Sequence, residues 1–349
     1  MTLRTTATPA DLAPRRPASA RPRRATGLAV CVLAVVVAVV CSLAFGSRVV
    51  GWSDVVAGVL HPDDTIAQAA VASRVPRTLL GLLVGAALGL AGSVMQGLTR
   101  NPLADPALLG VSSGASLFVV LGMAWVGLAT LTQYVWAAFL GAALASLLVY
   151  AIGSMGREGA TPLKLALAGA ATSAALLSAV SMVLLTRTDV LDTFRFWQVG
   201  SIGRASYAEI GQIVPFLVVG TVLAVGCARG MDAIALGDEV ATGLGQRVGL
   251  VRGVGALATV LLCGASVAIA GPIGFVGLVV PHLARAFTGP SHRWLLPYAA
   301  ALGAALLLAA DVVGRVVARP QEVEVGIVTA VLGAPVFIAI IRRQKVREL

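Results

Sequence analysis

Few residues in this chain are of types and spacing that could catalyse a reaction, bind a metal or transfer protons, and Asp311 is the main candidate. It is the only acid well inside the apolar part of a late hydrophobic segment, where a lone carboxylate is a candidate for proton or ion handling. Arg315 follows one helical turn later, so a local ion pair at a helix end is the plainer interpretation. His61, His282 and His292 are scattered and match no metal-binding or hydrolase motif. We therefore expect no catalytic centre, no metal site and no relay of several acids.

The sequence also lacks the usual means of handling nucleotides. No Gly-x-x-x-x-Gly-Lys-Ser/Thr loop occurs in it, so we do not expect the chain to bind ATP by that route. An enzymatic activity is therefore not predicted. What remains is a channel-like or transporter body whose source of energy is another molecule.

Composition predicts the elements that position these residues. Of the 349 residues, 58% are hydrophobic and 12% are charged, whereas soluble domains carry about a quarter charged residues. The apolar residues form stretches of about 18–22, which is long enough to cross a bilayer core of about 30 Å. Ten candidate spans lie at about 27–46, 77–98, 107–129, 134–153, 163–186, 208–228, 253–271, 274–288, 294–313 and 326–341. We therefore predict an all-α polytopic membrane protein embedded in a lipid bilayer.

The net charge of +10 reflects topology and is not the footprint of a nucleic-acid partner. When ten spans are threaded through a membrane, most of the 26 Lys and Arg residues fall on the face that carries both termini. The positive-inside rule then places both termini in the cytoplasm. Residues 1–25 are predicted to form a disordered cytoplasmic tail, 26–341 the transmembrane domain and 342–349 a second cytoplasmic tail.

One phrase of small residues occurs twice. Residues 85–92 read GAALGLAG and residues 264–271 read GASVAIAG, with starting points about half the chain length apart. Small-residue helices can resemble one another by chance, but similar Gly-Leu and Pro-containing runs follow both copies. Since five spans is an odd number, the two copies run in opposite directions through the membrane. We therefore predict two inverted five-helix repeats, an arrangement found in many transporters.

Three polar loops separate the predicted spans. The outer loop at 187–207 mixes aromatic and charged residues, which indicates a short helix at the outer surface. The outer loop at 47–76 ends in a basic run. The cytoplasmic loop at 229–252 has apolar residues at spacings of two to four among acids, which predicts a short amphipathic helix from about Asp238. Its acidic character disfavours the negative inner leaflet, so we expect it to bind a cytoplasmic protein.

Three blocks of sequence resemble a known family. The first contains RVPR at 74–77, QGLTRNPLADP at 96–106 and LGVSSGA at 109–115. The second reads AGPIGFVGLVVPHLAR at 270–285 and the third VGIVTAVLGAPVF at 325–337. Together they resemble the FecCD-type permeases, the membrane subunits of ABC importers for iron–siderophores, haem and vitamin B12. The similarity covers roughly residues 27–343.

This resemblance implies a fold and a set of partners. The fold is that of a type II ABC importer permease, similar to the vitamin B12 permease, with ten helices in each subunit. The partners are a second permease in a homodimer or close heterodimer, two cytoplasmic ABC ATPases and an extracytoplasmic substrate-binding protein. ATP and Mg²⁺ are used by the ATPases, and this chain itself is expected to bind no cofactor. The assembly would lie in a bacterial plasma membrane.

The resemblance also implies contacts with two of these partners. Outer guanidinium groups, which can pair two ways with a carboxylate, would receive the binding protein. They are Arg74, Arg77, Arg315 and Arg319. Simple snorkelling to lipid headgroups is the alternative interpretation. Residues of the 229–252 loop would couple to the ATPase, namely Leu236, Gly237, Asp238, Glu239, Ala241, Leu244 and Gly245.

The translocation path is expected to carry small and hydroxyl side chains, because large chelates need room and few strong contacts. The fifth span offers such side chains at Thr172, Ser173, Ser178 and Ser181. Serine and threonine also hold transmembrane helices together, so a purely structural role is the alternative.

The function predicted from these features is ATP-driven import of an iron(III)–siderophore or a similar metal chelate. Haem and vitamin B12 are alternative substrates, since their permeases share these motifs. An ion-driven secondary transporter would need several ionisable groups near the membrane midplane. A zinc or manganese ABC permease would be expected to have a path rich in histidine and acids, and an ABC exporter a fused ATPase.

Overall fold

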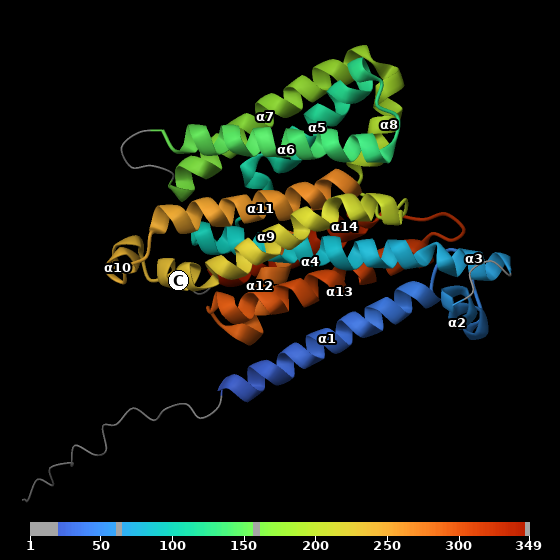
Figure 1. Ribbon diagram of the computed structural model, residues 1–349, viewed down its shortest axis with the longest axis horizontal. Helices are drawn as coiled ribbons and strands as arrows, with labels where there is room; N and C mark the ends of the chain where they lie inside the picture. Colours follow the sequence, from blue (N-terminus) through green and yellow to red (C-terminus); the bar gives the residue numbers. More distant parts are fainter. Residues whose placement is uncertain (1–19, 61–64, 156–160, 346–349) are drawn as a thin grey trace, which may run out of the picture.

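The computed structural model describes residues 20–60, 65–155 and 161–345, and the remaining residues lie outside its described part. The described residues form helices and no strands, and most of the long helices run along one common direction (Figure 1). The principal helices are α1 (Ala20–Ala44), α4 (Arg74–Thr99), α5 (Val111–Leu121), α6 (Leu131–Gly153), α7 (Pro162–Thr186), α9 (Tyr207–Ile234), α11 (Val248–Ala270), α12 (Val276–Thr288), α13 (His292–Val317) and α14 (Val325–Lys345).

Shorter elements lie between the principal helices. They are α2 (Trp52–Leu60), α3 (Ile66–Ala72), the 3₁₀ turn η2 (Pro106–Leu109), the π-helical turn η3 (Gly122–Val126), α8 (Thr188–Gln198) and α10 (Asp238–Gly243). The predicted short helix within 187–207 is confirmed as α8. The two short helices α2 and α3 within the 47–76 loop were not predicted.

The all-helical membrane fold is confirmed, whereas the number of crossings stays a prediction. Within the described ranges, seven stretches are long and apolar enough to span a bilayer by length and composition: α1 from Arg24, α3 joined to α4, α6, α7, α9, α11 and α13. Three shorter apolar helices, Val111–Val126, Val276–Thr288 and Val325–Ala339, stand where the third, eighth and tenth spans were predicted.

Two helices continue into the predicted tails where the structure describes them. Helix α1 begins at Ala20, so the last residues of the predicted disordered tail, 20–25, are helical. Helix α14 likewise continues to Lys345, into the predicted second tail. Residues 1–19 and 346–349 lie outside the described part. Charged residues flanking an apolar segment can continue its helix beyond the membrane, so the predicted limits of the transmembrane domain at 26 and 341 stay a prediction.

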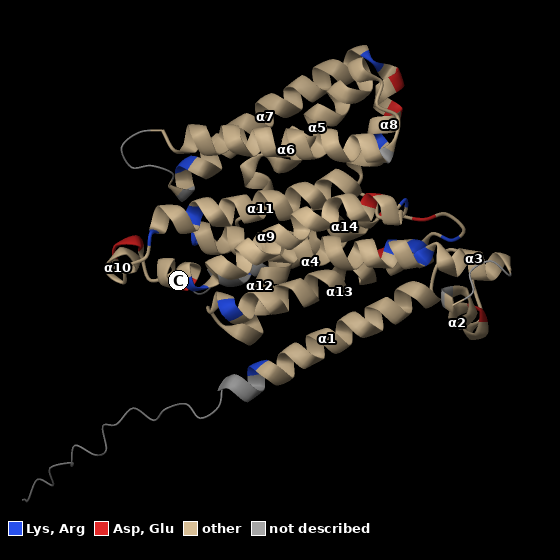
Figure 2. Ribbon diagram, viewed as in Figure 1, with Lys and Arg blue, Asp and Glu red and all other residues tan. Residues whose placement is uncertain are grey.

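The two ends of the molecule are distinct. Helix α10, the start of α1 and the end of α14 lie at one end, and α2, α3 and α8 lie at the other (Figure 1). Following the predicted topology, we call these the inner end and the outer end. Figure 2 shows that charged positions gather toward the two ends, leaving the middle of most helices without charge. This distribution suits helices whose centres lie in hydrocarbon.

Helix α4 lies at the centre of the fold, and its glycines allow its backbone to touch those of its neighbours. A Cβ atom added at Gly85 would lie 2.4 Å from the carbonyl oxygen of Gly303 on α13. A Cβ added at Gly92 would lie 1.8 Å from the carbonyl oxygen of Gly277 on α12. Such distances exclude any side chain, so the first small-residue phrase is required for close helix packing.

The second copy of the phrase, in α11, makes different contacts. A Cβ added at Gly264 would be at 3.6 Å from its nearest neighbours, which is ordinary van der Waals contact. Gly271 instead ends the helix with a positive φ of 69°. The course of α11 is nevertheless opposite to that of α4 (Figure 1), as inverted repeats require. Helix α4 packs on α13 of the second half, and α11 packs on α6 of the first, so the halves interlock.

Replacing Gly92 by alanine should destabilise the fold, because the new methyl group would overlap the backbone of α12. Overpacking of this kind costs about 1–3 kcal/mol. We expect a lower thermal midpoint for the purified protein in detergent. Gly226→Ala in α9 is the matched control, since no atom lies within 4 Å of the added Cβ. Equal midpoints for the two variants would contradict the packing role of Gly92.

Candidate functional site

A buried ion-pair network lies at the outer end and is centred on Asp311 of α13. Its side chain is 1% exposed and lies between Arg77 of α4 and Arg315 of α13. The Oδ1 atom of Asp311 is 2.7 Å from Nη2 of Arg77, and its Oδ2 atom is 2.8 Å from Nη2 of Arg315. The predicted local pair between Asp311 and Arg315 is confirmed. The bond to Arg77, from the other half of the chain, was not predicted.

Arg77 has a second acidic partner in Glu322, on the linker between α13 and α14. Its Nη1 atom donates a hydrogen bond of 2.6 Å to Oε2 of Glu322. Burial alone would raise the pKa of Glu322, but the hydrogen bonds and positive charge of Arg77 outweigh it and hold the pKa below its ordinary value. Glu322 is therefore an anion at neutral pH, and Arg77 bridges the two acidic groups of the network.

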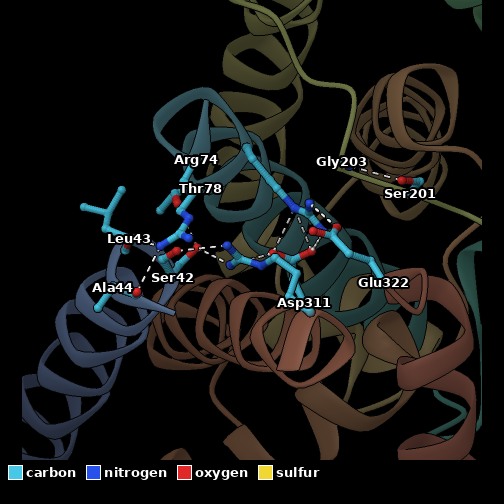
Figure 3. A network of polar contacts seen from close by, with 11 residues as sticks. Ser42, Leu43, Ala44, Arg74, Thr78, Ser201, Gly203, Asp311 and Glu322 are labelled. Atoms are coloured by element: carbon cyan, nitrogen blue, oxygen red, sulfur yellow. Dashed lines mark hydrogen bonds and ion pairs between the residues drawn. The ribbon is translucent and has the colours of Figure 1, made fainter. Parts of the chain in front are cut away.

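Arg74 caps the end of α1. Its Nη1 atom donates to the carbonyl oxygens of Leu43 and Ala44 at 2.8 and 2.9 Å, and its Nη2 atom donates to that of Arg48 at 2.8 Å. A helix end leaves its last carbonyl groups without intrahelical donors and carries a partial negative charge, so a guanidinium is well suited to this position. Figure 3 shows Arg74 directed toward the end of α1.

Ser42 joins the cap of α1 to the acidic centre. The Nη1 and Nη2 atoms of Arg315 donate to the carbonyl oxygen and the hydroxyl oxygen of Ser42 at 3.0 and 2.8 Å. The same hydroxyl lies 2.7 Å from that of Thr78 on α4. Helices α1, α4 and α13 are therefore held together by one continuous set of charge-assisted bonds (Figure 3).

These contacts give three of the four predicted docking arginines an internal role. Arg74 is 6% exposed and Arg315 is 1% exposed, so a partner's carboxylate cannot reach either without displacing the bonds described above. Arg77 is also largely enclosed, with 11% of its side chain exposed. Only Arg319 is exposed among the four. The positive-inside rule indicates on which side an arginine lies but not how deeply it is buried, so the sequence did not reveal this.

The predicted coupling loop forms a short helix at the inner end, and its start at Asp238 is confirmed. Gly237 and Gly245 bound this helix with φ values of +110° and +79°, which favour glycine. Leu236 is 64% exposed, Leu244 is 62% exposed and Val240 is 50% exposed. Ala241 is buried against the bundle. The helix thus presents an apolar face with no partner among the described residues.

Asp238 ties this helix to the two copies of the repeated span. Its Oδ2 atom accepts a hydrogen bond of 2.9 Å from Nη2 of Arg252, near the start of α11. Its Oδ1 atom is 3.4 Å from Nη2 of Arg100, which directly follows α4. The sequence predicted a helix-capping or charging role for Asp238 but not these partners. Arg100 lies in the other half of the chain, and Arg252, although in the same predicted loop, is brought to Asp238 by the packing of α10 on α11. Glu239, the next residue, is exposed.

The four hydroxyl residues proposed for the path do not share one environment. Thr172 is buried, and Ser173 accepts a hydrogen bond of 3.1 Å from Ser113 on α5, as expected of a contact between helices. Ser178 and Ser181 are exposed on α7, where each hydroxyl donates to a carbonyl four residues earlier. Only these last two lie on a face of α7 that a second subunit or a substrate could contact.

One further polar cluster lies near the inner end. Asp232 at the end of α9 accepts a hydrogen bond of 2.6 Å from the backbone N–H of His292 and lies 2.8 Å from its Nδ1 atom. This pair joins α9 to α13. Within the described ranges, no group of three or more His, Cys, Asp or Glu side chains could hold a metal ion.

Replacing Asp311 by asparagine should destabilise the folded protein strongly, because two buried guanidiniums would lose their shared carboxylate. Removing one member of a buried ion pair typically costs about 3–5 kcal/mol. Thermal unfolding of the purified variant measures the loss. Asp192→Asn on α8 is the matched control, since its pairing with Arg195 at 3.7 Å is exposed and should contribute little. A loss no larger than that of the control would refute a structural role for the network.

Comparison with known proteins agrees with the resemblance seen in the sequence. The model of the FecCD transport family matches residues 34–343. The chain is 41% identical to the Bacillus subtilis protein named "Probable siderophore transport system permease protein YfiZ", over 90% of this chain and 95% of that protein. It is 46% identical to the Escherichia coli ferric enterobactin transport system permease protein FepD, over 78% of this chain and 81% of that protein.

A solved structure shares the fold over almost its whole length. It is described as "An inward-facing conformation of a putative metal-chelate type ABC transporter", and it superposes with a TM-score of 0.79 at 27% sequence identity. The match covers 93% of this chain and 99% of that one. The family model, the relatives and this solved structure agree with the three sequence blocks. The chain belongs to the FecCD transport family of membrane permeases.

Proposed function

We propose that this chain is the transmembrane permease subunit of an ATP-driven importer that moves an iron(III)–siderophore, or a similar metal chelate, into the cytoplasm. The family and the substrates named for the relatives support the class of transporter. The structural observation that carries the proposal is the short helix α10, whose apolar face is exposed and whose base is fixed to the bundle. Such a helix can receive a force from a partner and pass it on.

The partners follow from this role. Two cytoplasmic ABC ATPases would bind and hydrolyse ATP with Mg²⁺, and this chain would bind neither. Leu236, Val240 and Leu244 would enter an apolar groove of one ATPase subunit, as amphipathic helices do in many complexes. A second permease subunit, identical or closely related, would complete the path, with Ser178 and Ser181 as candidate lining residues.

The contacts at α10 suggest how its movement would reach the membrane. Asp238 connects α10 both to Arg100, after α4, and to Arg252, in α11. A displacement of α10 would therefore pull on one helix from each half of the molecule at the same time. This is the input needed for two inverted repeats to rock against each other.

The outer network would support docking of the binding protein at longer range. Four guanidiniums, of Arg74, Arg77, Arg315 and Arg319, stand against the two carboxylates of Asp311 and Glu322, so this cluster of six side chains has a positive excess. A field of this kind attracts acidic surfaces even when some of its charges are buried. We propose that Arg319 makes direct contacts and that the buried arginines contribute mainly through this field.

Uptake by proteoliposomes that contain the chain with its ATPase and binding protein tests the proposed function. We expect a ferric siderophore to accumulate when ATP and Mg²⁺ are available to the ATPase. Ion gradients without ATP should drive no uptake. Accumulation that follows a proton or sodium gradient and ignores ATP would instead support the secondary transporter. Cobalamin and haem in the same assay test the alternative substrates.

Two substitutions in the inner end test the coupling role of α10. Leu244→Asp should prevent stable association with the ATPase, because a charge would enter the proposed apolar contact. Asp238→Asn should preserve association and ATP hydrolysis but reduce transport by about tenfold, because α10 would lose its ion pairs to α4 and α11. Copurification, ATPase rate and uptake are measured on the same preparations.

Thr242→Asp is the control for the added charge, since Thr242 is exposed on α10 but lies outside the apolar set. It should leave association intact. Normal transport in both Leu244→Asp and Asp238→Asn would show that α10 does not couple ATP hydrolysis to movement.

A further inference from the structure

A groove opens on the side of the molecule between α6 and α11, toward the inner end. The end of α6 and the start of α11 lie there, and these two helices pack on each other (Figure 1). The groove has a volume of about 300 Å³. The lining residues that matter for its chemistry are Leu109 of η2, Leu147 and Tyr150 of α6, and Gly253, Ala256 and Leu257 of α11. We call it the α6–α11 groove.

The groove is apolar and lies between two helices that can span a bilayer. Both α6 and α11 are long and apolar enough to cross the membrane. Leu147 and Leu257, one from each helix, line the groove and are 65% and 51% exposed, so the groove continues to the surface of the bundle. Among the described lining residues, only Ser146 and Tyr150 carry a polar side-chain atom. Apolar cavities stay dry, so we expect an apolar group from the surrounding bilayer to fill this one.

Small residues of α11 leave this space open. A Cβ added at Gly253 would have its nearest neighbour 4.0 Å away, at the hydroxyl oxygen of Tyr150, whereas one at Gly92 would overlap the backbone of α12. The α11 side of the lining runs from Gly253 to Val260, about 10 Å along the helix axis. An apolar cavity of about 150 Å³ holds the six carbons of benzene, so about 300 Å³ holds about twelve carbons. Part of an acyl chain meets both measures.

A positively charged mouth lies beside the groove. A second cavity, of about 20 Å³, shares three lining residues with the groove, Tyr150 among them, and is also lined by Arg252. Arg252 and Arg100 both pair with the single carboxylate of Asp238. Two guanidiniums thus share one carboxylate, which leaves one positive charge at the inner end of the groove. Guanidinium groups bind phosphate oxygens well.

The other polar groups near the mouth leave this balance unchanged. Arg247, directly before α11, and Glu239 on α10 are both exposed and carry opposite charges. Figure 2 shows positive positions at the start of α11 and negative ones on α10. The hydroxyl of Tyr150 has no hydrogen-bond partner within the described ranges and can donate to a phosphate or ester oxygen. A phosphate group with one net negative charge is the complement of this mouth.

A second copy of this chain is the other candidate occupant of the groove, and the charge of the mouth disfavours it. Two identical subunits related by a two-fold axis place the same patch on both sides of their interface. Contact through the α6–α11 groove would therefore bring the two positive mouths to the same level of the membrane, facing each other. Like charges across an interface are unfavourable, whereas an anionic lipid neutralises the charge.

We propose that the α6–α11 groove binds an anionic phospholipid, with part of one acyl chain in the groove and the phosphate group at the positive mouth. The lipid would hold α6 of the first half against α11 of the second at their inner ends. Its binding requires no ATPase, binding protein or substrate, and it does not depend on whether the chain imports a chelate.

Native mass spectrometry of the full chain, released from nanodiscs of equal parts phosphatidylglycerol and phosphatidylcholine, tests the site. We expect one phosphatidylglycerol molecule to stay bound per chain, at about five times the occupancy of phosphatidylcholine. One basic charge near a membrane surface favours an anionic lipid to about this extent. Thermal unfolding in detergent gives a second measurement, because phosphatidylglycerol should raise the midpoint more than phosphatidylcholine does.

Two substitutions locate the lipid. Gly253→Phe fills the groove with a ring and should lower the retention of phosphatidylglycerol about tenfold. Gly249→Phe is its matched control on the same helix, since no atom lies within 4 Å of the added Cβ and Gly249 lines neither cavity. Arg252→Gln removes the net charge and should make the retention of the two lipids about equal. Its control is Arg229→Gln, an exposed position on α9 outside both linings.

Three outcomes would overturn the lipid site. They are equal retention of the two lipids by the unaltered chain, equal losses in the groove variants and their controls, and a Gly253→Phe variant that separates two copies of the chain while its lipid retention is normal. The last result would make the groove a contact between subunits. Should Arg252→Gln fail to fold, Gly253→Phe and its control still decide the matter. Since neither measurement uses ATP or a chelate, the lipid site and the proposed function can fail independently.

Discussion

The backbone of α4 touches the backbones of α12 and α13, and this contact determines where most of the other parts can lie. Lipid tails are as apolar as leucine side chains, so helices in a membrane gain little from hiding apolar surface from lipid. Close backbone contact at Gly85 and Gly92 supplies van der Waals packing in its place. It also brings Arg77 at one end of α4 to Asp311, while Arg100 at the other end lies beside Asp238.

The two ends of α4 take part in two different assemblies of charged residues. At the outer end, charged groups that would be costly in lipid are buried together, and they join α1, α4 and α13 into one body. At the inner end, a single carboxylate connects a small exposed helix to α4 and α11, one from each half. The bonds to Arg77 of α4 lie in the first of these assemblies, and the proposed ATPase contact lies on the second. Movement of α4 relative to α11 would therefore affect both.

Local patterns in the sequence predicted a large part of this structure. Long apolar segments predicted the helical membrane fold, the i, i+4 spacing predicted the pair between Asp311 and Arg315, and acids beside small residues predicted the start of α10 at Asp238. The partners of Arg77 and Asp238 could not be predicted in this way. They depend on how helices pack against one another, across the halves for Arg77 and Arg100 and within one half for Arg252, and no spacing along the chain encodes that. The capping of α1 by Arg74 was missed for the same reason.

Photo-crosslinking from position 244 in intact cells tests the central claim most directly, that the exposed face of α10 receives an ATPase subunit. A benzophenone amino acid at this position should crosslink to a cytoplasmic protein that carries a nucleotide-binding domain. The same probe at position 192 on α8, at the outer end, should not capture that protein. Capture of the ATPase from position 192, or of an extracytoplasmic protein from position 244, would contradict both the topology and the coupling role.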